Sequence, residues 1–200
     1  MDGHTPGPII PHPQPEWVKR HPISADQYQR MGELGILPPD ARVELIEGEL
    51  IAMSPMGAPH VFKIMKLNRL LVTALGDRAM LGPQISARLG DYSEPEPDFV
   101  VVRPSYTAQA ATPPKPEDIL LVIEVSDSSL RYDKTRKAAL YARYGVPEYW
   151  IVDITGPAAL IVHRDSKGDA YTSVRHAAPD EVLEPLLLPG LRLPVADLLA

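Results

Sequence analysis

The chain has 200 residues and a formal net charge of −6 at pH 7, with 44% hydrophobic and 23% charged residues. This composition is typical of soluble globular domains, and the length predicts one domain with a well-filled core. The absence of cysteine excludes disulfide bonds, cysteine nucleophiles and cysteine-ligated zinc. The acidic balance argues against overall electrostatic binding of nucleic acid, although a local basic patch fits within an acidic total.

The N-terminal segment predicts a flexible arm, because prolines stand at positions 6, 8, 11, 13 and 15 with few apolar residues between them. We therefore expect a Pro-rich arm over residues 1–22 and a single folded domain over residues 23–200. The arm lacks the basic start and apolar stretch of an export signal. No stretch reaches the ~18 consecutive apolar residues of a membrane span. Both observations favour a cytoplasmic protein that does not enter a membrane.

Helical periodicity of apolar residues appears in three segments, at 25–35, 60–75 and 133–144. Ser24 is a typical N-cap for the first of these helices, and Gly76 is a typical stop for the second. The two apolar runs within residues 42–54 flank Glu47-Gly48, which is the composition of a tight β-hairpin. Further strands are predicted at 84–89, 98–103, 119–125, 149–153 and 159–163, the last two forming a hairpin, with an edge strand or packing segment at 183–194. The fold class is therefore α/β or α+β, with strands between helices.

Two acidic residues stand in strongly apolar strand sequences. Glu124 comes near the end of the strand at 119–125, where burial of a lone carboxylate is costly. Asp98 begins the strand at 98–103, so the two carboxylates meet at one end of the sheet if the strands pair. Paired acids in a partly buried site suit a hard divalent cation such as Mg²⁺. Spacing alone is equally consistent with two acids that cap their strands or pair with arginine.

Lys137 is a candidate only through its position after Glu124. Asp133, Lys137 and Tyr141 are spaced i, i+4 and i+8 along one stripe of the predicted helix. An Asp–Lys pair at this spacing is also a routine surface pair. The stripe reaches the acids only if this helix folds back over the carboxylate end of the sheet.

The other candidates are weaker. Glu44 alternates with its neighbours in the first hairpin as an ordinary solvent-facing strand residue does. His60, just before the long helix, fits a cap, a phosphate contact or an exposed side chain. No histidine pair has zinc spacing, no glycine-rich phosphate loop is present, and Ser126 and Ser128 lack the GxSxG context of a serine hydrolase.

Five ordered blocks of residues nevertheless form one pattern. They are Arg42-Val-Glu-Leu-Ile-Glu-Gly-Glu-Leu50, Met53-Ser-Pro55, Ser93-Glu-Pro-Glu-Pro-Asp-Phe-Val-Val-Val102, Ile123-Glu-Val-Ser126 and Asp133…Lys137…Tyr141…Gly145-Val-Pro-Glu-Tyr-Trp-Ile-Val-Asp153. This pattern, over residues 24–195, resembles the Uma-type family, a bacterial branch of the PD-(D/E)xK nuclease superfamily that is grouped with restriction endonucleases. The resemblance implies a restriction-endonuclease-like core, with a mixed central sheet flanked by helices and an N-terminal β-hairpin.

The resemblance also implies a set of metal ligands. Asp98 and Glu124 match the acids that bind the metal in this superfamily, the carbonyl of Val125 matches a further ligand, and Glu44 matches the N-terminal acid that completes such sites. The implied cofactor is Mg²⁺, with Mn²⁺ as an alternative, and it lowers the pKa of a bound water for phosphodiester hydrolysis.

One motif position departs from the superfamily pattern. Ser126 stands where the standard motif has lysine, and Lys137 matches the lysine that family members of this type carry on the following helix. An ammonium that reaches the same space from a helix is physically sensible, since the chemistry needs a cation near the water and the phosphate. Tyr141 and Gln84 are candidates for hydrogen bonds to this shell, and His60 for a contact with substrate.

The implied activity is endonucleolytic cleavage of nucleic acid, with DNA as the expected substrate. A homodimer is expected because two symmetric centres cut two strands, with contacts from the Pro-rich C-terminal segment or from Tyr149-Trp150. Two other functions remain open. The acidic charge and Ser126 favour an inactive module for nucleic-acid binding or protein assembly, and the same metal site fits a hydrolase of smaller phosphoesters.

Overall fold

The structure is a computed structural model that describes residues 20–38, 40–106 and 112–200. Most of the predicted arm at 1–22 therefore lies outside the described residues. None of the helices in the described parts of the chain combines the length and hydropathy that crossing a lipid bilayer requires.

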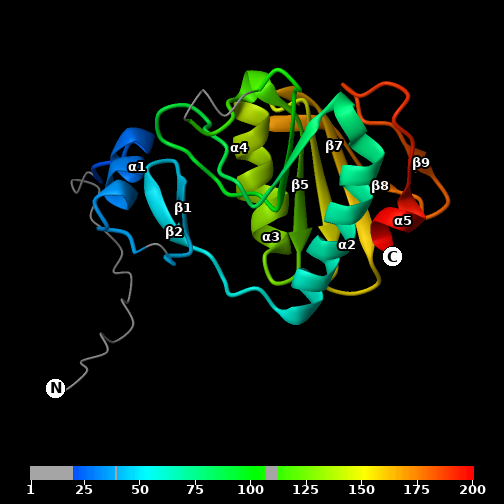
Figure 1. The fold of residues 1–200 in the computed structure, drawn as a ribbon, viewed down its shortest axis with the longest axis horizontal. Coiled ribbons are helices and arrows are strands. Elements are labelled where there is room, and N and C mark those ends of the chain that lie inside the picture. The colour runs from blue at the N-terminus through cyan, green and yellow to red at the C-terminus, as the bar shows by residue number, and fades with distance from the viewer. Residues whose placement is uncertain (1–19, 39, 107–111) are drawn as a thin grey trace.

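The chain contains both helical segments and strands (Figure 1). The helical segments are α1 (Ala25–Glu33), α2 (Ala58–Leu75), η1 (Gly76–Arg78), η3 (Pro116–Asp118), α3 (Leu130–Tyr132), the π-helical turn η4 (Asp133–Lys137), α4 (Ala138–Arg143) and α5 (Val195–Leu199). The strands are β1 (Val43–Ile46), β2 (Glu49–Ala52), β3 (Met80–Pro83), β4 (Phe99–Val102), β5 (Ile119–Ser126), β6 (Glu148–Asp153), β7 (Ala159–Lys167), β8 (Ala170–Ala177), β9 (Val182–Leu183) and β10 (Leu193–Pro194).

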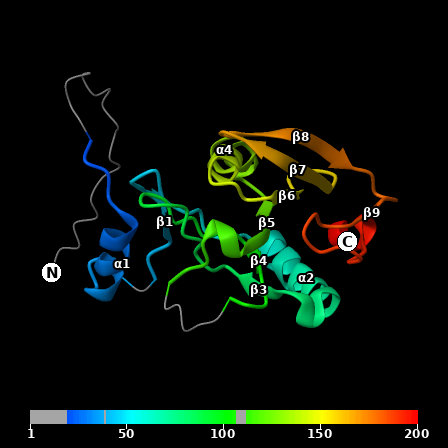
Figure 2. The ribbon, with the colours of Figure 1, turned by 90° about the horizontal axis from the view of Figure 1, so that it is seen from above.

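The central sheet is mixed and has the strand order β3-β4-β5-β6-β7-β8. Its neighbours are antiparallel except β5 and β6, which run parallel and are connected through α3, η4 and α4. The predicted hairpin at 42–54 is confirmed as the β1–β2 pair, which lies with α1 beside the sheet (Figures 1 and 2). The mixed sheet between helices and the N-terminal hairpin agree with the predicted fold class.

Two hydrophobic clusters cover the two faces of the sheet. Figure 2 shows α4 on one side of the sheet and α2 and α5 on the other. Leu121, Ile123 and Val125 of β5 belong to the cluster that contains residues of α2 and α5, whereas Val122 belongs to the cluster that contains α4. Since successive side chains of a strand point to opposite faces, Glu124 lies on the face covered by η4 and α4. The alternation of β5 therefore places a carboxylate among apolar residues beneath this helical segment.

Several sequence predictions need correction. Residues 84–89 form no strand, because Gln84 has φ 49° and ends β3 at Pro83. The helix expected at 133–144 begins at Leu130 and passes through the π turn. Tyr149 and Trp150, expected at a dimer contact, are both 0% exposed. The homodimer itself stays a prediction, with the C-terminal segment as the remaining contact region.

Candidate active site

A cavity of about 380 Å³ lies where the hairpin, the start of α2 and the end of β5 meet. Its wall is strongly acidic, because it contains six carboxylic side chains but only one lysine and one arginine. The acids are Glu44, Glu96, Asp98, Glu124, Asp127 and Asp133, and the basic residues are Arg42 and Lys137. The cavity therefore needs additional positive charge before it can accept an anionic ligand.

Strand register brings Asp98 and Glu124 together, as the sequence predicts for paired strands. Phe99 of β4 pairs with Ile123 of β5, so the residue before one lies opposite the residue after the other. The backbone N–H of Asp98 donates to Glu124 Oε2 at 3.3 Å, and Asp98 Oδ2 accepts from the backbone N–H of Val125 at 2.7 Å. The two acids are thus held at the same end of the sheet.

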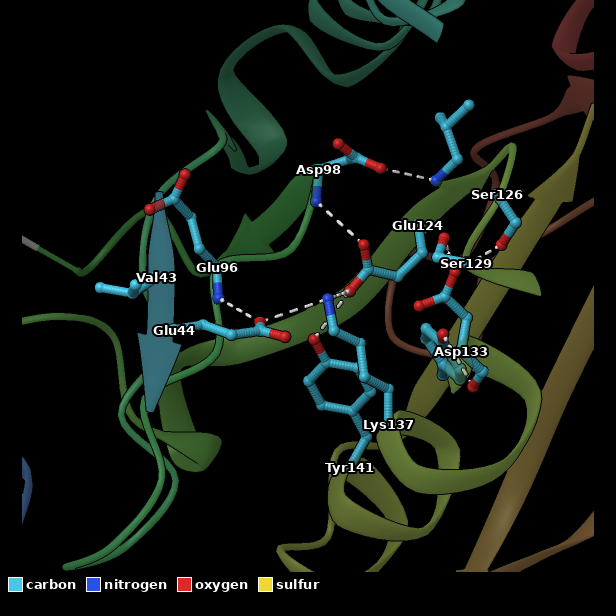
Figure 3. A network of polar contacts seen from close by, with 12 residues as sticks. Val43, Glu44, Glu96, Asp98, Glu124, Ser126, Ser129, Asp133, Lys137 and Tyr141 are labelled. Carbon is cyan, nitrogen blue, oxygen red and sulfur yellow. Dashed lines mark hydrogen bonds and ion pairs between the residues drawn. The ribbon is translucent and has the colours of Figure 1, made fainter. Parts of the chain in front are cut away.

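Lys137 reaches these acids from the π turn (Figure 3). Its Nζ donates to Glu124 Oε1 at 2.8 Å and lies 3.4 Å from Glu44 Oε2. The hydroxyl of Tyr141 donates to Glu124 Oε1 at 3.1 Å, so it completes the contacts of that oxygen. Both side chains come from the segment that was expected to fold back over the sheet, and Lys137 is only 6% exposed.

Glu44 is buried, with 2% exposure, which overturns its interpretation as an ordinary solvent-facing strand residue. The cause is the docking of the hairpin, because Leu45 forms an antiparallel bridge with Glu94 in the loop before β4. The backbone N–H of Glu96 donates to Glu44 Oε2 at 3.3 Å (Figure 3). Docking therefore adds Glu44 as a third carboxylate to the group formed by Asp98 and Glu124, and as a second one beside Lys137.

His60 and Gln84 have different positions in this shell. His60 Nε2 lies 3.2 Å from Asp98 Oδ2, whereas its Nδ1 is buried with no hydrogen-bond partner. Gln84 lines the cavity, but its amide donates to Met56 Sδ at 3.0 Å rather than to an acid. The structure thus places His60 against the acids and gives Gln84 no contact with them.

Burial dominates the electrostatics of the pair formed by Glu124 and Lys137. Loss of hydration raises the pKa of Glu124 to about 8, with Asp133 and Asp98 adding to the rise and Lys137 opposing it. Burial alone would lower the pKa of Lys137, but the carboxylates of Glu124, Glu44 and Asp133 outweigh it and raise that pKa. The ammonium group of Lys137 is therefore charged, whereas neighbouring groups replace only part of the hydration that the carboxyl group of Glu124 loses on burial.

Comparison with known proteins decides the family. The family model Uma2, described as "Putative restriction endonuclease", matches residues 25–196. The chain belongs to the Uma2 family. The crystal structure of "a putative nuclease belonging to DUF820" from Anabaena variabilis matches it with a TM-score of 0.67 and 18% identity. That match covers 89% of this chain and 98% of the other, and it shows that the two chains share a fold. A search of curated proteins finds no match.

In this Uma2-family chain, the structure gives a reason for Ser126 at the motif position where the superfamily has lysine. The hydroxyl of Ser126 donates to Asp133 Oδ2 at 2.7 Å, and Ser129 donates to the same oxygen at 2.5 Å. These bonds anchor the start of the π turn that carries Lys137. Ser126 therefore stabilises the helix that supplies the cation and has no direct contact with the other acids.

Sequence reasoning missed Glu96 and Asp133 as parts of the cavity wall, and it also missed Tyr132. The alternation Glu94-Pro-Glu-Pro-Asp98 is a signal for Glu96, because prolines keep the segment extended and place its acids at alternate positions. Asp133 was noticed only as a helix-surface residue. No local sequence signal distinguishes Tyr132.

The donor set of the cavity suits a hard cation, although its carboxylates are not yet arranged around one. Among residues 20–38, 40–106 and 112–200, no three His, Asp or Glu side chains are grouped so as to hold a metal ion. Instead, Lys137 binds Glu124 and lies beside Glu44. The oxygen chemistry of the wall and the incompletely compensated charge of Glu124 both fit Mg²⁺. A metal that binds here has to loosen the lysine contacts.

Proposed function

We propose that this protein is a Mg²⁺-dependent endonuclease that hydrolyses phosphodiester bonds in nucleic acid, with DNA as the preferred substrate. The observation that carries the proposal is the buried contact between Lys137 and Glu124 beside Asp98. Burying such charges is costly, so a convergence from distant elements is more readily explained by chemistry than by stability. Membership of the Uma2 family supports the same reaction class.

In this proposal Asp98, Glu124 and Glu44 hold the metal together with the carbonyl of Val125, a residue that also lines the cavity. Mn²⁺ is the expected substitute because it accepts the same oxygen ligands. The bound ion supplies Lewis-acid stabilisation of the phosphate and lowers the pKa of a water.

The remaining side chains position and compensate this group. Lys137 orients the attacking water and offsets negative charge that develops on the phosphate. Tyr141 fixes the orientation of Glu124 through its hydrogen bond to Oε1. His60 contacts Asp98 through Nε2, and a substrate contact by its buried Nδ1 requires movement of the groups that cover this atom.

Cleavage of supercoiled plasmid in Mg²⁺ or Mn²⁺ tests the proposal. We expect Glu124→Gln to lower the rate at least about a hundredfold, because a neutral amide removes a ligand charge while keeping the side-chain shape. Glu184→Gln is the matched control, since Glu184 is exposed and distant from the cavity wall. Unchanged cleavage by purified Glu124→Gln protein contradicts the assignment.

A panel of substrates defines the class of ester. Single-stranded DNA, RNA and a small phosphodiester are compared with plasmid under the same conditions. Faster turnover of the small diester, with none of the polymers cleaved, points instead to a hydrolase of smaller phosphoesters.

A non-catalytic module is the second candidate, and the engagement of Lys137 by Glu124 and Glu44 favours it. In such a module these side chains form a closed ionic cluster that fixes the hairpin on the sheet. It would bind nucleic acid or a protein partner without a metal. This function requires that Mg²⁺ has no affinity that depends on Asp98.

A further inference from the structure

One cationic side chain in the wall of the acidic cavity makes no ion pair with the described residues. Arg42 Nε is buried with no hydrogen-bond partner, and none of the ion pairs in the described parts of the chain includes Arg42. Lys137, the other lysine or arginine of the wall, contacts both Glu124 and Glu44. Arg42 is therefore the cation of this cavity that has binding capacity left.

The hairpin places Arg42 in the same cavity wall as Glu44. The backbone N–H of Met53 donates to the carbonyl of Arg42 at 2.9 Å, so the ladder continues one residue beyond β1. Arg42 and Glu44 are two residues apart, which puts both on one face of the hairpin with a separation of about 7 Å along the strand. Arg42 is half-buried, whereas Glu44 is 2% exposed. Arg42 is thus the less buried of the two residues, although its Nε atom is covered.

Unsatisfied polar atoms gather at this cavity. Three of the five buried side-chain atoms without a partner in the described structure belong to its lining, namely Arg42 Nε, His60 Nδ1 and Tyr132 Oη. A buried donor without a partner costs free energy, so such atoms are typical of a site that a ligand completes. Of these three residues, arginine is the one that carries a permanent positive charge, so Arg42 is the best suited to an anionic ligand.

We propose that Arg42 binds a backbone phosphate of the nucleic-acid substrate at the mouth of the cavity, next to the phosphodiester bond that is hydrolysed at the acids. The inference rests on the proposed nuclease function and adds to it the residue that holds the substrate. A guanidinium presents a planar fork of donors that matches two phosphate oxygens. Its charge also reduces the repulsion between a polyanion and a wall with six acids.

A purely structural role for Arg42 predicts a different effect of its replacement. Glu96 lines the same cavity. Burial raises the pKa of its carboxyl group, and among the neighbouring charges Arg42 opposes this rise most strongly. If Arg42 served only to neutralise Glu96, its replacement would lower thermal stability and leave the electrostatics of DNA binding unchanged. Salt dependence separates the two roles, because each phosphate contact releases condensed counterions from the DNA.

The experiment measures the fluorescence anisotropy of a short labelled DNA duplex in Ca²⁺, which replaces Mg²⁺ so that binding occurs without cleavage. We expect Arg42→Gln to weaken binding about tenfold and to reduce the slope of log affinity against log salt by about one. Arg42→Lys keeps the charge but loses the fork, so it retains the slope and loses less affinity. Arg192→Gln, at an exposed position outside the cavity wall, is the matched control.

The outcomes separate this inference from the nuclease proposal. An Arg42→Gln protein that keeps the wild-type affinity and salt slope overturns the inference, whatever its melting temperature and even if the wild type cleaves plasmid. A wild type that binds no duplex overturns it as well. If Glu124→Gln retains full cleavage, the nuclease assignment fails while the salt slope still reports on Arg42. Should Arg42→Gln not fold, Arg42→Lys becomes the test. Because lysine keeps the positive charge, a fall of about one in the slope of log affinity against log salt for this variant contradicts the phosphate contact.

Discussion

Glu124 shows how one buried carboxylate organises its surroundings. It accepts hydrogen bonds from Lys137 and Tyr141 at one oxygen and from the backbone of Asp98 at the other. Even so, burial raises its pKa to about 8, because these donors replace only part of its hydration. A group in this condition gains from a further cation, which is the property expected of a metal ligand before the metal binds.

Removal of the ammonium tests how strongly these charges depend on each other. We expect Lys137→Met to lower the free energy of unfolding by about 3–5 kcal/mol, since Glu124 and Glu44 are then buried without a compensating charge. Addition of Glu124→Gln to this variant should recover part of the loss. Urea unfolding measures both values, and Lys167→Met, at an exposed position, is the control.

The same variant has a defined pH dependence. Without Lys137 the pKa of Glu124 lies further above its value in the unfolded chain, because the group that opposed the rise is gone. The protonated carboxyl then favours the folded state, and this contribution is lost as the pH rises through the folded pKa. The deficit against wild type should therefore grow as the pH rises through about 8, and it should be larger at about pH 9 than at about pH 6. An equal deficit at both pH values contradicts the coupling.

At the scale of elements, the site depends on two segments that leave regular geometry. The backbone N–H of Ala138 donates to the carbonyl of Asp133, which is the i to i+5 pattern of a π turn. This turn directs Asp133 to Ser126 and Ser129 while Lys137 contacts Glu124. Such turns are rare, and they are frequently found at functional sites.

The hairpin is the second such element, and its turn is held tightly. Gly48 donates to the carbonyl of Tyr92 at 2.7 Å and accepts from the backbone of Ile23 at 3.0 Å. Its φ is 81°, and an added Cβ would lie 2.9 Å from Pro22 Cα. We expect Gly48→Ala to cost about 1–3 kcal/mol of stability through backbone strain and overpacking.

The consequence of Gly48→Ala for activity follows from what the hairpin carries. A displaced β1 moves Glu44 away from Lys137, so nuclease activity should fall along with the denaturant midpoint. Gly156→Ala is the matched control, since a Cβ added at Gly156 would meet nothing within 4 Å and the φ of this residue is not positive. Equal stability of the two variants would show that the turn is not clamped.

At the scale of the whole molecule, the sequence predicts best those parts whose burial is local. Strands β4 and β5 were found because continuous apolar runs are typical of the centre of a sheet. Strand β8 was missed because it lies at the sheet edge and only Tyr171 and Ala177 are buried in it. An edge strand with one wet face has little apolar signal.

The same distinction applies to the site. Asp98 and Glu124 were found through their apolar neighbours, which make a lone carboxylate conspicuous. Glu44 was not assigned correctly from spacing, because its burial depends on the bridge between Leu45 and Glu94. Lys137 likewise becomes an active-site candidate only when β5 and the following helix are folded together. Contacts between segments distant in the sequence leave no periodic signal in either segment.

Metal binding joins these scales, because it links a local exchange of partners to the stability of the whole domain. We expect Mg²⁺ at ten times its dissociation constant to stabilise the folded state by about 1.4 kcal/mol, which raises the melting temperature by about 3–6 °C. Thermal unfolding with and without Mg²⁺ measures this shift. Asp98→Asn should abolish it, since Asp98 lies against Glu124 in the proposed donor set.

Asp77→Asn provides the matched comparison for this titration, because Asp77 is exposed at the end of α2 and remote from the cavity wall. A shift that Asp77→Asn retains and Asp98→Asn loses places Mg²⁺ at the acids, where it competes with Lys137 for Glu124. A wild type with no shift, or a shift that Asp98→Asn keeps in full, favours the non-catalytic module. The ionic cluster would then serve to fix the hairpin on the sheet rather than to hold an ion.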